Sequence, residues 1–425
     1  MAGSCMTIAE KLRDVRKDRK LSQASFADAL GFAVSKISDI ENNLKTYTDE
    51  QILVLKKLLG IEGAPLTDGE LTTFKKRLYI WRDYIKNNRI DEGRKLHQEL
   101  MVITKLSFER DLCLLYRIFE AKQLTEEDNF SAARDILESI EGLLNDTCNE
   151  NKYHFYYTMG TLCIHERNAK DALAAYEMAS SLEVDGLEKE VTLYYNMAIC
   201  YSFLGRYVRT INAILQIYNE FDHSRINAHT LRFDNELAIN YVRINQIDQA
   251  IGLLENALDK AKNLDNRAFV GITFHNLGCA YRKLDKHEEA IEYFDKAAEY
   301  FEEGTSHYLE NLYFKALCLI ALKKKSQYKS VLLRSESLSE KSEHYALLFR
   351  SLAHLLSIRD EHSVDFIEGR TIPYLLEGYY YYLALDFCDA LISVHTKNEA
   401  KVKALEIKAL RGEIVSKITF GGGNT

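Results

Sequence analysis

The sequence predicts an all-α protein, in which a small N-terminal helical domain precedes a right-handed α-solenoid of stacked helix pairs. Only two of the 425 residues are proline, so long helices can form without interruption. One spacing of small and bulky residues recurs about every 40 residues from Ile80 to Leu352, a period typical of repeat arrays. No apolar run reaches the roughly 18 residues that a membrane span needs, so we expect no membrane partner.

The N-terminal part predicts four short amphipathic helices, because apolar residues recur there at helical spacing. The expected segments are about Thr7–Arg19, Gln23–Leu30, Val34–Asn42 and Thr48–Leu59. Ser22 has a side chain that suits the N-cap of the second segment. Gly31 suits a turn that needs a positive φ, and Asn43, which tolerates the left-handed conformation, ends the third segment.

The run from Leu21 to Asn43 resembles the helix-turn-helix of the Cro/repressor and xenobiotic-response-element family. The matching positions are Gln23, Ala27, Gly31, Ser35, Ile37 and Ile40-Glu41-Asn42. The resemblance implies that the segment beginning at Val34 enters the major groove of a double-stranded DNA operator, while Gln23 and Lys45 face phosphates. The DNA-binding residues it implies are Gln23, Ala33, Val34, Ser35, Lys36, Ser38, Asn42 and Lys45.

This chain departs from that family at two positions. Val34 stands where the family often has Gln, so contact with a thymine methyl group would replace an amide–adenine pair. Asn43 stands where the family usually has Gly. The alternative is a degenerate four-helix module kept only for dimerisation. A single small head contacts few phosphates, so DNA binding predicts a homodimer held together by the array, and a higher oligomer is also open.

Charge and composition divide the chain into a head, a linker and an array. Residues 1–60 hold ten Lys and Arg against eight Asp and Glu, whereas the chain as a whole has a net charge of −8. We therefore expect nucleic-acid contact only in the head. Residues 61–70 contain Gly and Pro and predict a linker. The expected domains are a DNA-binding domain at 6–60, the linker at 61–70, and a repeat domain for peptide binding and dimerisation at 71–420.

The repeat spacing is typical of the tetratricopeptide repeat. In its clearest copy, Gly278 and Ala290 are the small residues where two antiparallel helices touch, and Phe294 fills the gap to the next pair. Centres near Ile80 and at successive positions to Leu352, with a final pair from Tyr374 to Ile418, predict eight or nine repeats.

Polar residues on the first helix of each pair predict a ligand groove, because this helix lines the concave face of such an array. The expected peptide-binding residues are Tyr157, Tyr195, Asn196, Arg232, Asn235, Glu236, Arg243, His275, Asn276 and Arg282. A side-chain amide both donates and accepts, so a row of Asn residues can hold an extended oligopeptide by its backbone. The arginines suit a carboxylate, and Glu236 suits an amine. The alternative is that some of these residues bridge neighbouring helices.

Catalytic and metal-binding classes find no support in the sequence. It contains no glycine-rich phosphate loop and no H-E-x-x-H or G-x-S-x-G motif, so we expect no enzyme, no cofactor and no metal site. The eight cysteines include no C-x-x-C pair and predict reduced, mostly buried thiols. Met1–Met6 carries no apolar signal segment, which predicts a cytoplasmic protein.

A repressor-type head before a long tetratricopeptide array resembles the RRNPP family of Gram-positive pheromone receptors, and the repeat number resembles its NprR-type members more than its shorter PlcR type. The resemblance implies a quorum-sensing transcription regulator that binds a short imported signalling peptide and thereby changes DNA binding. Two alternatives remain open. One is a peptide-independent repressor. The other is a protein-binding scaffold that acts on a phosphorelay partner through the surface from Trp81 to Leu124.

Overall fold

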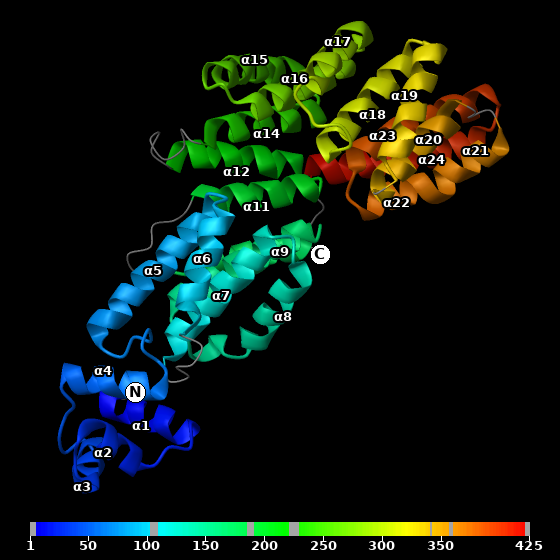
Figure 1. The fold of residues 1–425 in the computed structure, drawn as a ribbon. Helices are drawn as coiled ribbons and strands as arrows, with labels where there is room; N and C mark the ends of the chain where they lie inside the picture. The colour runs from blue at the N-terminus through cyan, green and yellow to red at the C-terminus, as the bar shows by residue number, and fades with distance from the viewer. Residues whose placement is uncertain are drawn as a thin grey trace. The chain divides into compact units, whose positions relative to one another are not determined.

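The computed structural model describes residues 6–102, 109–184, 191–220, 229–340, 342–356 and 360–420, in which all regular elements are helices (Figure 1). The all-α fold class is therefore confirmed. The chain divides into two compact units, residues 1–188 and 189–425, and each is described by itself. No helix in these ranges is both long and apolar enough to cross a membrane.

The head consists of four helices at nearly the expected positions. They are α1 (Ile8–Asp18), α2 (Gln23–Leu30), α3 (Val34–Glu41) and α4 (Asp49–Leu59). Thr7 and Thr48 form capping boxes at the starts of α1 and α4, and Ser22 caps α2. Gly31 has a φ of 65° and Asn43 a φ of 60°, as the turn chemistry predicted. Helix α3 ends one residue earlier than expected.

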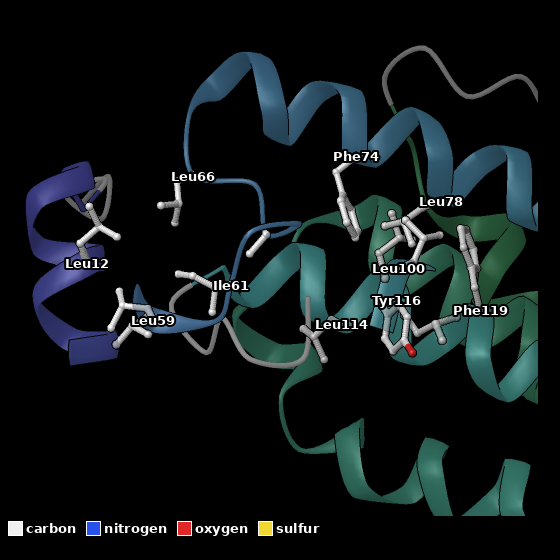
Figure 2. Packing of buried hydrophobic residues seen from close by; sticks show 14 of the residues in the cluster. Leu12, Leu59, Ile61, Leu66, Phe74, Leu78, Leu100, Leu114, Tyr116 and Phe119 are labelled. Carbon is white, nitrogen blue, oxygen red and sulfur yellow. The ribbon is translucent and has the colours of Figure 1, made fainter. Parts of the chain in front are cut away.

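The connection from the head to the first repeat is part of the core. Ile61, Ala64 and Leu66 are at most 1% exposed, although they lie outside helices. They belong to one apolar cluster that extends from Leu12 of the head into the repeats (Figure 2). The predicted linker is thus a buried strap rather than a solvated spacer within this unit. Whether it also separates two domains functionally stays a prediction.

The first unit continues with three antiparallel helix pairs. They are α5 (Asp68–Lys86) with α6 (Ile90–Leu100), α7 (Arg110–Glu126) with α8 (Phe130–Glu141), and α9 (Asn149–His165) with α10 (Ala169–Ser181). The first helix of each pair packs against the first helix of the next, so α7 contacts both α5 and α9. This nearest-neighbour packing is the organisation of a repeat array.

The second unit contains six further pairs. The regular ones are α11 (Val191–Phe203) with α12 (Tyr207–Glu220), α14 (Thr230–Arg243) with α15 (Ile247–Asn263), α16 (Arg267–Lys283) with α17 (His287–Ala298), α18 (Ser306–Ala321) with α19 (Lys325–Leu338), and α23 (Tyr381–Lys397) with α24 (Lys401–Phe420). The eighth pair is irregular: α20 (Glu343–Leu356) is followed by α21 (Glu361–Phe366), a π-helical turn and α22 (Ile372–Glu377). The described residues therefore form nine pairs, the upper end of the expected range.

The tight turns within the pairs share one backbone feature. In each regular pair, one residue of the turn has a positive φ, and the amide of the next residue donates to a carbonyl in the last turn of the first helix. This is the Schellman type of helix ending, which asparagine, aspartate and glycine tolerate best. The turn residues are Asn88, Asp128, Arg167, Gly205, Asn245, Asp285, Lys323 and Glu399. Their regular spacing marks the repeats as clearly as the apolar pattern does.

The small residues of the repeat pattern lie where the two helices of a pair approach each other. A Cβ atom at Gly278 would lie 2.6 Å from the Phe294 ring, and one at Gly160 would lie 2.7 Å from the Tyr176 ring. Ala290 and Ala297 are completely buried. The prediction that small residues lie where the two helices touch, with bulky residues packed beside them, is confirmed at these contacts.

The cysteines agree with the expectation of reduced thiols. All seven in the described part of the chain are free, and five of them are buried. Cys5 lies outside the described residues.

Candidate functional site

Two predicted groove residues of neighbouring repeats are joined by a side-chain hydrogen bond. The Asn276 amide on α16 donates to Asn235 Oδ1 on α14 at 3.0 Å, and the Asn235 amide donates to the carbonyl of Leu231 at 2.9 Å. Both asparagines are less than 8% exposed. Asn235 therefore bridges helices, the alternative that the sequence left open. Asn276 uses one donor here, and its carbonyl oxygen has no protein partner within the described residues.

His275 belongs to a buried chain of polar groups at the contact between α16 and α18. Its Nδ1 lies 3.1 Å from Asn311 Oδ1, and the Asn311 amide donates to the carbonyl of Phe294 at 2.8 Å. Burial lowers the pKa of His275, more than the nearby Glu310 and Asn311 raise it. The imidazole is therefore neutral at neutral pH, and it connects α16 to α18 rather than carrying a charge.

Two of the three predicted groove arginines, Arg243 and Arg282, lie in a cluster of aromatic rings, which we call the arginine–tyrosine cluster. It consists of Tyr207, Arg243, Arg282, Phe314, Tyr382 and Asp386. The Arg243 guanidinium lies 5.1 Å from the Tyr207 ring centre and 4.9 Å from the Tyr382 ring centre, distances typical of cation–π contact. It also donates to the Ser202 hydroxyl at 2.8 Å.

Arg282 is the second cation of the arginine–tyrosine cluster. It lies 5.1 Å from the Phe314 ring centre, and its Nη2 lies 3.1 Å from Asp386 Oδ2. Lys283 Nζ lies 3.5 Å from the other Asp386 oxygen. Burial raises the pKa of Asp386, but Arg282 and Lys283 outweigh this effect and hold the pKa below its ordinary value. Asp386 is therefore ionised in this environment.

The other predicted groove residues have neighbours of their own. Arg232 is exposed and lies 5.9 Å from the ring centre of Tyr195, which is buried against Phe233. Glu236 accepts from the Asn240 amide at 2.7 Å. Asn196 is half-buried on α11.

Tyr157 lies in the first unit, so only its own neighbours are described. Its ring packs edge-on against Tyr176, with the Lys122 ammonium 5.1 Å from its ring centre. The structure thus brings Asn235 and Asn276 together, and places Arg243 and Arg282 in one cluster, without adding Tyr157 to either. The binding role of all ten predicted residues stays a prediction.

Several residues that contact the predicted groove residues were missed by the sequence reasoning. Asn240 and Asn311 lie at repeat positions other than those expected to face the groove, whereas Ser202 occupies the same repeat position as Arg282 but was not chosen. Tyr382 and Asp386 come from the last pair, which no repeat template connects to Arg243 or Arg282. The signal that could have indicated them is the four-residue spacing of Tyr382 and Asp386, which places them on one face of α23.

A second candidate surface lies at the start of α3 in the head. Ala33, Val34 and Ser35 are exposed, and Val34 has 46% of its surface exposed despite its apolar side chain. Lys36 lies over the Phe32 ring at 3.4 Å. Asn42 is exposed just beyond α3, and Ser38 is half-buried. These residues present a short polar and apolar edge at one helix end.

Two predicted phosphate contacts already have protein partners. The Gln23 amide donates to Glu41 Oε2 at 2.8 Å, and Glu41 also accepts two bonds from Arg16, at 2.7 and 2.8 Å. Lys45 pairs with Asp39 at 2.7 Å. Lys45 is exposed and can exchange this partner for another anion, whereas Gln23 helps to bury the Arg16–Glu41 pair that holds α1 to α3.

Comparison with known proteins shows which proteins have a similar sequence. The tetratricopeptide repeat family model matches residues 229–303. The chain is 27% identical over 275 residues to the transcriptional activator NprA of Geobacillus stearothermophilus, covering 62% of this chain and 65% of NprA. It is 23% identical over 227 residues to response regulator aspartate phosphatase A of Bacillus subtilis (strain 168), covering 50% of this chain and 60% of the phosphatase. The matches thus span less than two-thirds of either relative.

One solved structure has the same arrangement of helices. NprR in complex with its cognate peptide NprX matches with a TM-score of 0.65 at 19% identity, over 81% of this chain and 99% of the NprR chain. The fold therefore defines an α-solenoid of tetratricopeptide repeats. The relatives and the repeat match agree with the resemblance to RRNPP-type regulators that the sequence indicated. The repeat match lies outside residues 6–60, so it does not bear on the head.

Proposed function

We propose that the chain is a quorum-sensing transcription regulator. In this proposal a short imported oligopeptide binds the inner helices of the repeats and changes the binding of a homodimer to operator DNA through α3. The relatives named as a transcriptional activator and a response regulator phosphatase support a regulatory role, and NprR was solved with a peptide. The ligand class and the DNA contacts rest on the residues of this chain.

The observation that carries the peptide proposal is Asn276. Its carbonyl oxygen is left without a protein partner within the described residues, next to an amide that Asn235 holds in place. A fixed acceptor of this kind suits a backbone N–H group of an extended peptide. Arg282 lies on the same helix less than two turns away and supplies a positive charge for a carboxylate.

A binding screen with peptides of about 5 to 10 residues tests this proposal, because each backbone N–H and C=O group of an extended peptide can form about one hydrogen bond. We expect Asn276→Ala to weaken a bound peptide about tenfold, the effect of losing one hydrogen bond of about 1.4 kcal/mol. Asn235→Ala is the matched control, because it breaks the same Asn–Asn bond but leaves the Asn276 oxygen. Equal losses in both variants would show that only the bridge matters, and a folded chain that retains no peptide would contradict the proposal.

The DNA part of the proposal rests on the exposed start of α3. A double-stranded operator can be selected from random duplexes with the full chain. We expect Ser35→Glu to abolish binding to it, because the new carboxylate would face phosphates and base edges. Thr72→Glu on α5 is the control, since Thr72 is exposed and lies outside the head. Fluorescence anisotropy at two salt concentrations measures both variants, and unchanged binding by Ser35→Glu would contradict the proposed surface.

The phosphorelay alternative gains support from the match to a response regulator phosphatase. The surface that the sequence suggested for it includes Trp81, and that part of the expectation needs a correction. Trp81 is completely buried and donates to Gln123 Oε1 at 2.6 Å. A partner at this surface would contact the exposed neighbours of Trp81 instead.

A further inference from the structure

The last repeat pair of the second unit packs back onto its earlier repeats. Helix α24 contacts α12, and the red C-terminal part of α24 lies next to α12 in Figure 1. At the start of α23, the Tyr381 ring covers Gly205 so closely that a Cβ atom there would lie 2.2 Å from it. The next residue, Tyr382, packs against Arg243. Helix α23 therefore covers the inner-helix arginines that the sequence predicted as ligand contacts.

Arg282 is only partly satisfied by its partner on α23. One guanidinium nitrogen, Nη2, lies 3.1 Å from Asp386 Oδ2, while Nε is buried without a hydrogen-bond partner within the described residues. Oδ2 of Asp386 also lacks a hydrogen bond of good geometry. A guanidinium binds a carboxylate best through two parallel hydrogen bonds. The contact with Asp386 thus leaves part of the binding capacity of Arg282 unused.

Arg243 has no carboxylate within ion-pair distance in the same cluster. It makes no ion pair within the described part of the chain, its direct neighbours are two tyrosine rings and the Ser202 hydroxyl, and the carboxylates of Glu236 and Glu310 act on it from beyond ion-pair distance. Burying a guanidinium without a carboxylate is unfavourable. Asp386 pairs with Arg282 and Lys283 and not with Arg243, so a carboxylate placed against Arg243 would be stabilised here.

We propose that Asp386 occupies the place of a ligand carboxylate and competes with it for Arg282. A peptide with a C-terminal carboxylate or an acidic side chain displaces Asp386, forms the two-bonded contact with Arg282 and releases α23 from the inner helices. This inference rests on the proposed peptide-binding function and names its anionic group. It also makes the position of α23 depend on whether the peptide is bound.

The first test needs no ligand. Hydrogen exchange of the full chain, followed by mass spectrometry, reports the opening of α23. We expect Asp386→Asn to speed exchange of the amides of Tyr381–Lys397, because the neutral amide no longer holds Arg282. Asp389→Asn is the matched control, since Asp389 lies on the same helix but is exposed and pairs with Arg411 of α24 at 2.5 Å. Equal exchange in the two variants would overturn the competition.

The second test uses a library of heptapeptides, made once with free C-terminal carboxylates and once with C-terminal amides. Retention is measured by affinity selection and mass spectrometry. We expect Asp386→Asn to bind free-carboxylate or acidic peptides about 5-fold to 100-fold more tightly than the unmodified chain, the usual size of a coupling between sites. Neutral peptides with a C-terminal amide should gain less affinity from this substitution. If the wild-type chain retains a peptide and Asp386→Asn retains it equally, the competition is overturned but the proposed function is not. If no variant retains any peptide, the proposed function is contradicted.

Discussion

Gly278 shows how a single residue determines the distance between two helices. Its missing side chain lets α16 approach the Phe294 ring of α17, and Gly160 does the same for α9 and the Tyr176 ring. Glycine in a helix interior costs about 1 kcal/mol relative to alanine, so it needs a compensating contact. The buried aromatic ring over each glycine provides that compensation.

Gly278→Ala should destabilise the α16–α17 pair by about 1 to 3 kcal/mol, because the added methyl group overlaps the Phe294 ring. Gly252→Ala is the control: Gly252 is also helical, but nothing lies within 4 Å of an added Cβ atom, so the better helix propensity of alanine should stabilise α15 slightly. Native-state hydrogen exchange of the two pairs measures both effects. A stabilising Gly278→Ala would show that the rings move aside at little cost.

At the residue scale, the sequence could predict contacts that repeat and could not predict how polar groups pair. The small positions at Gly278 and Ala290 follow from the pattern, because every pair needs them. Asn235 and Asn276 also occupy repeat positions, but an amide can bind a ligand or a neighbouring amide. Only their 3.0 Å separation decides that Asn235 acts as a bridge.

At the scale of elements, Glu70 connects the end of the head to the start of α5. Its carboxylate accepts from Lys56 of α4 at 2.5 Å and from the backbone N–H groups of Leu66 and Thr67 at 2.9 and 3.0 Å. Burial raises the pKa of Glu70, but Lys56 and these N–H groups outweigh it and lower the pKa from 4.5 to about 2. The cap of α5 therefore depends on ionised Glu70.

This pKa predicts a loss of stability in acid. The folded-state pKa of Glu70 lies below its unfolded value, so its contribution is fully present above pH 4.5 and is lost as the pH falls towards about 2. Glu70→Gln should remove part of the difference in unfolding free energy between about pH 6 and about pH 2, the interval over which the contribution of Glu70 is lost. Glu62→Gln, an exposed position in the same connection, is the control. Identical pH profiles for the two variants would contradict this role.

Most helix boundaries could be predicted because their signals are local. Thr7, Ser22 and Thr48 cap the helices that they were expected to start. The eighth pair could not be predicted in detail, since its second half breaks into α21, a π-helical turn and α22 with Pro373 in its first turn. A repeat template describes the average pair and carries no information about such a departure.

At the scale of the whole molecule, the contact between α23 and the earlier repeats was beyond prediction. Arg282 and Asp386 belong to the sixth and ninth pairs, and the repeat period describes only contacts between neighbouring pairs. A non-local contact of this kind depends on the sum of small rotations from one pair to the next. Arg243 and Arg282 lie on the first helices of their pairs, α14 and α16, while the residues that cover them were not foreseen.

The strap of residues 61–66 predicts that a loop residue behaves like a core residue. Leu66→Ala should cost about 2 to 5 kcal/mol, because it leaves a cavity between the head and the first repeat. Leu44→Ala is the control, since Leu44 is also a loop leucine but is 74% exposed and should change stability by less than about 0.5 kcal/mol. Thermal unfolding of the full chains compares them. A mild effect of Leu66→Ala would show that the head is attached only loosely.

The same strap bears on how such proteins can be recombined. The head shares its apolar core with the first repeats, so it cannot be exchanged as an independent module. Any junction between residues 59 and 74 divides one set of packed side chains between two parent proteins. A hybrid would need Leu12, Leu59, Leu66 and Phe74 to come from the same source. Heads and arrays of this kind should therefore be inherited together. In the proposed regulator, a new operator specificity is more easily acquired by changing the few exposed residues at the start of α3 than by exchanging the whole head.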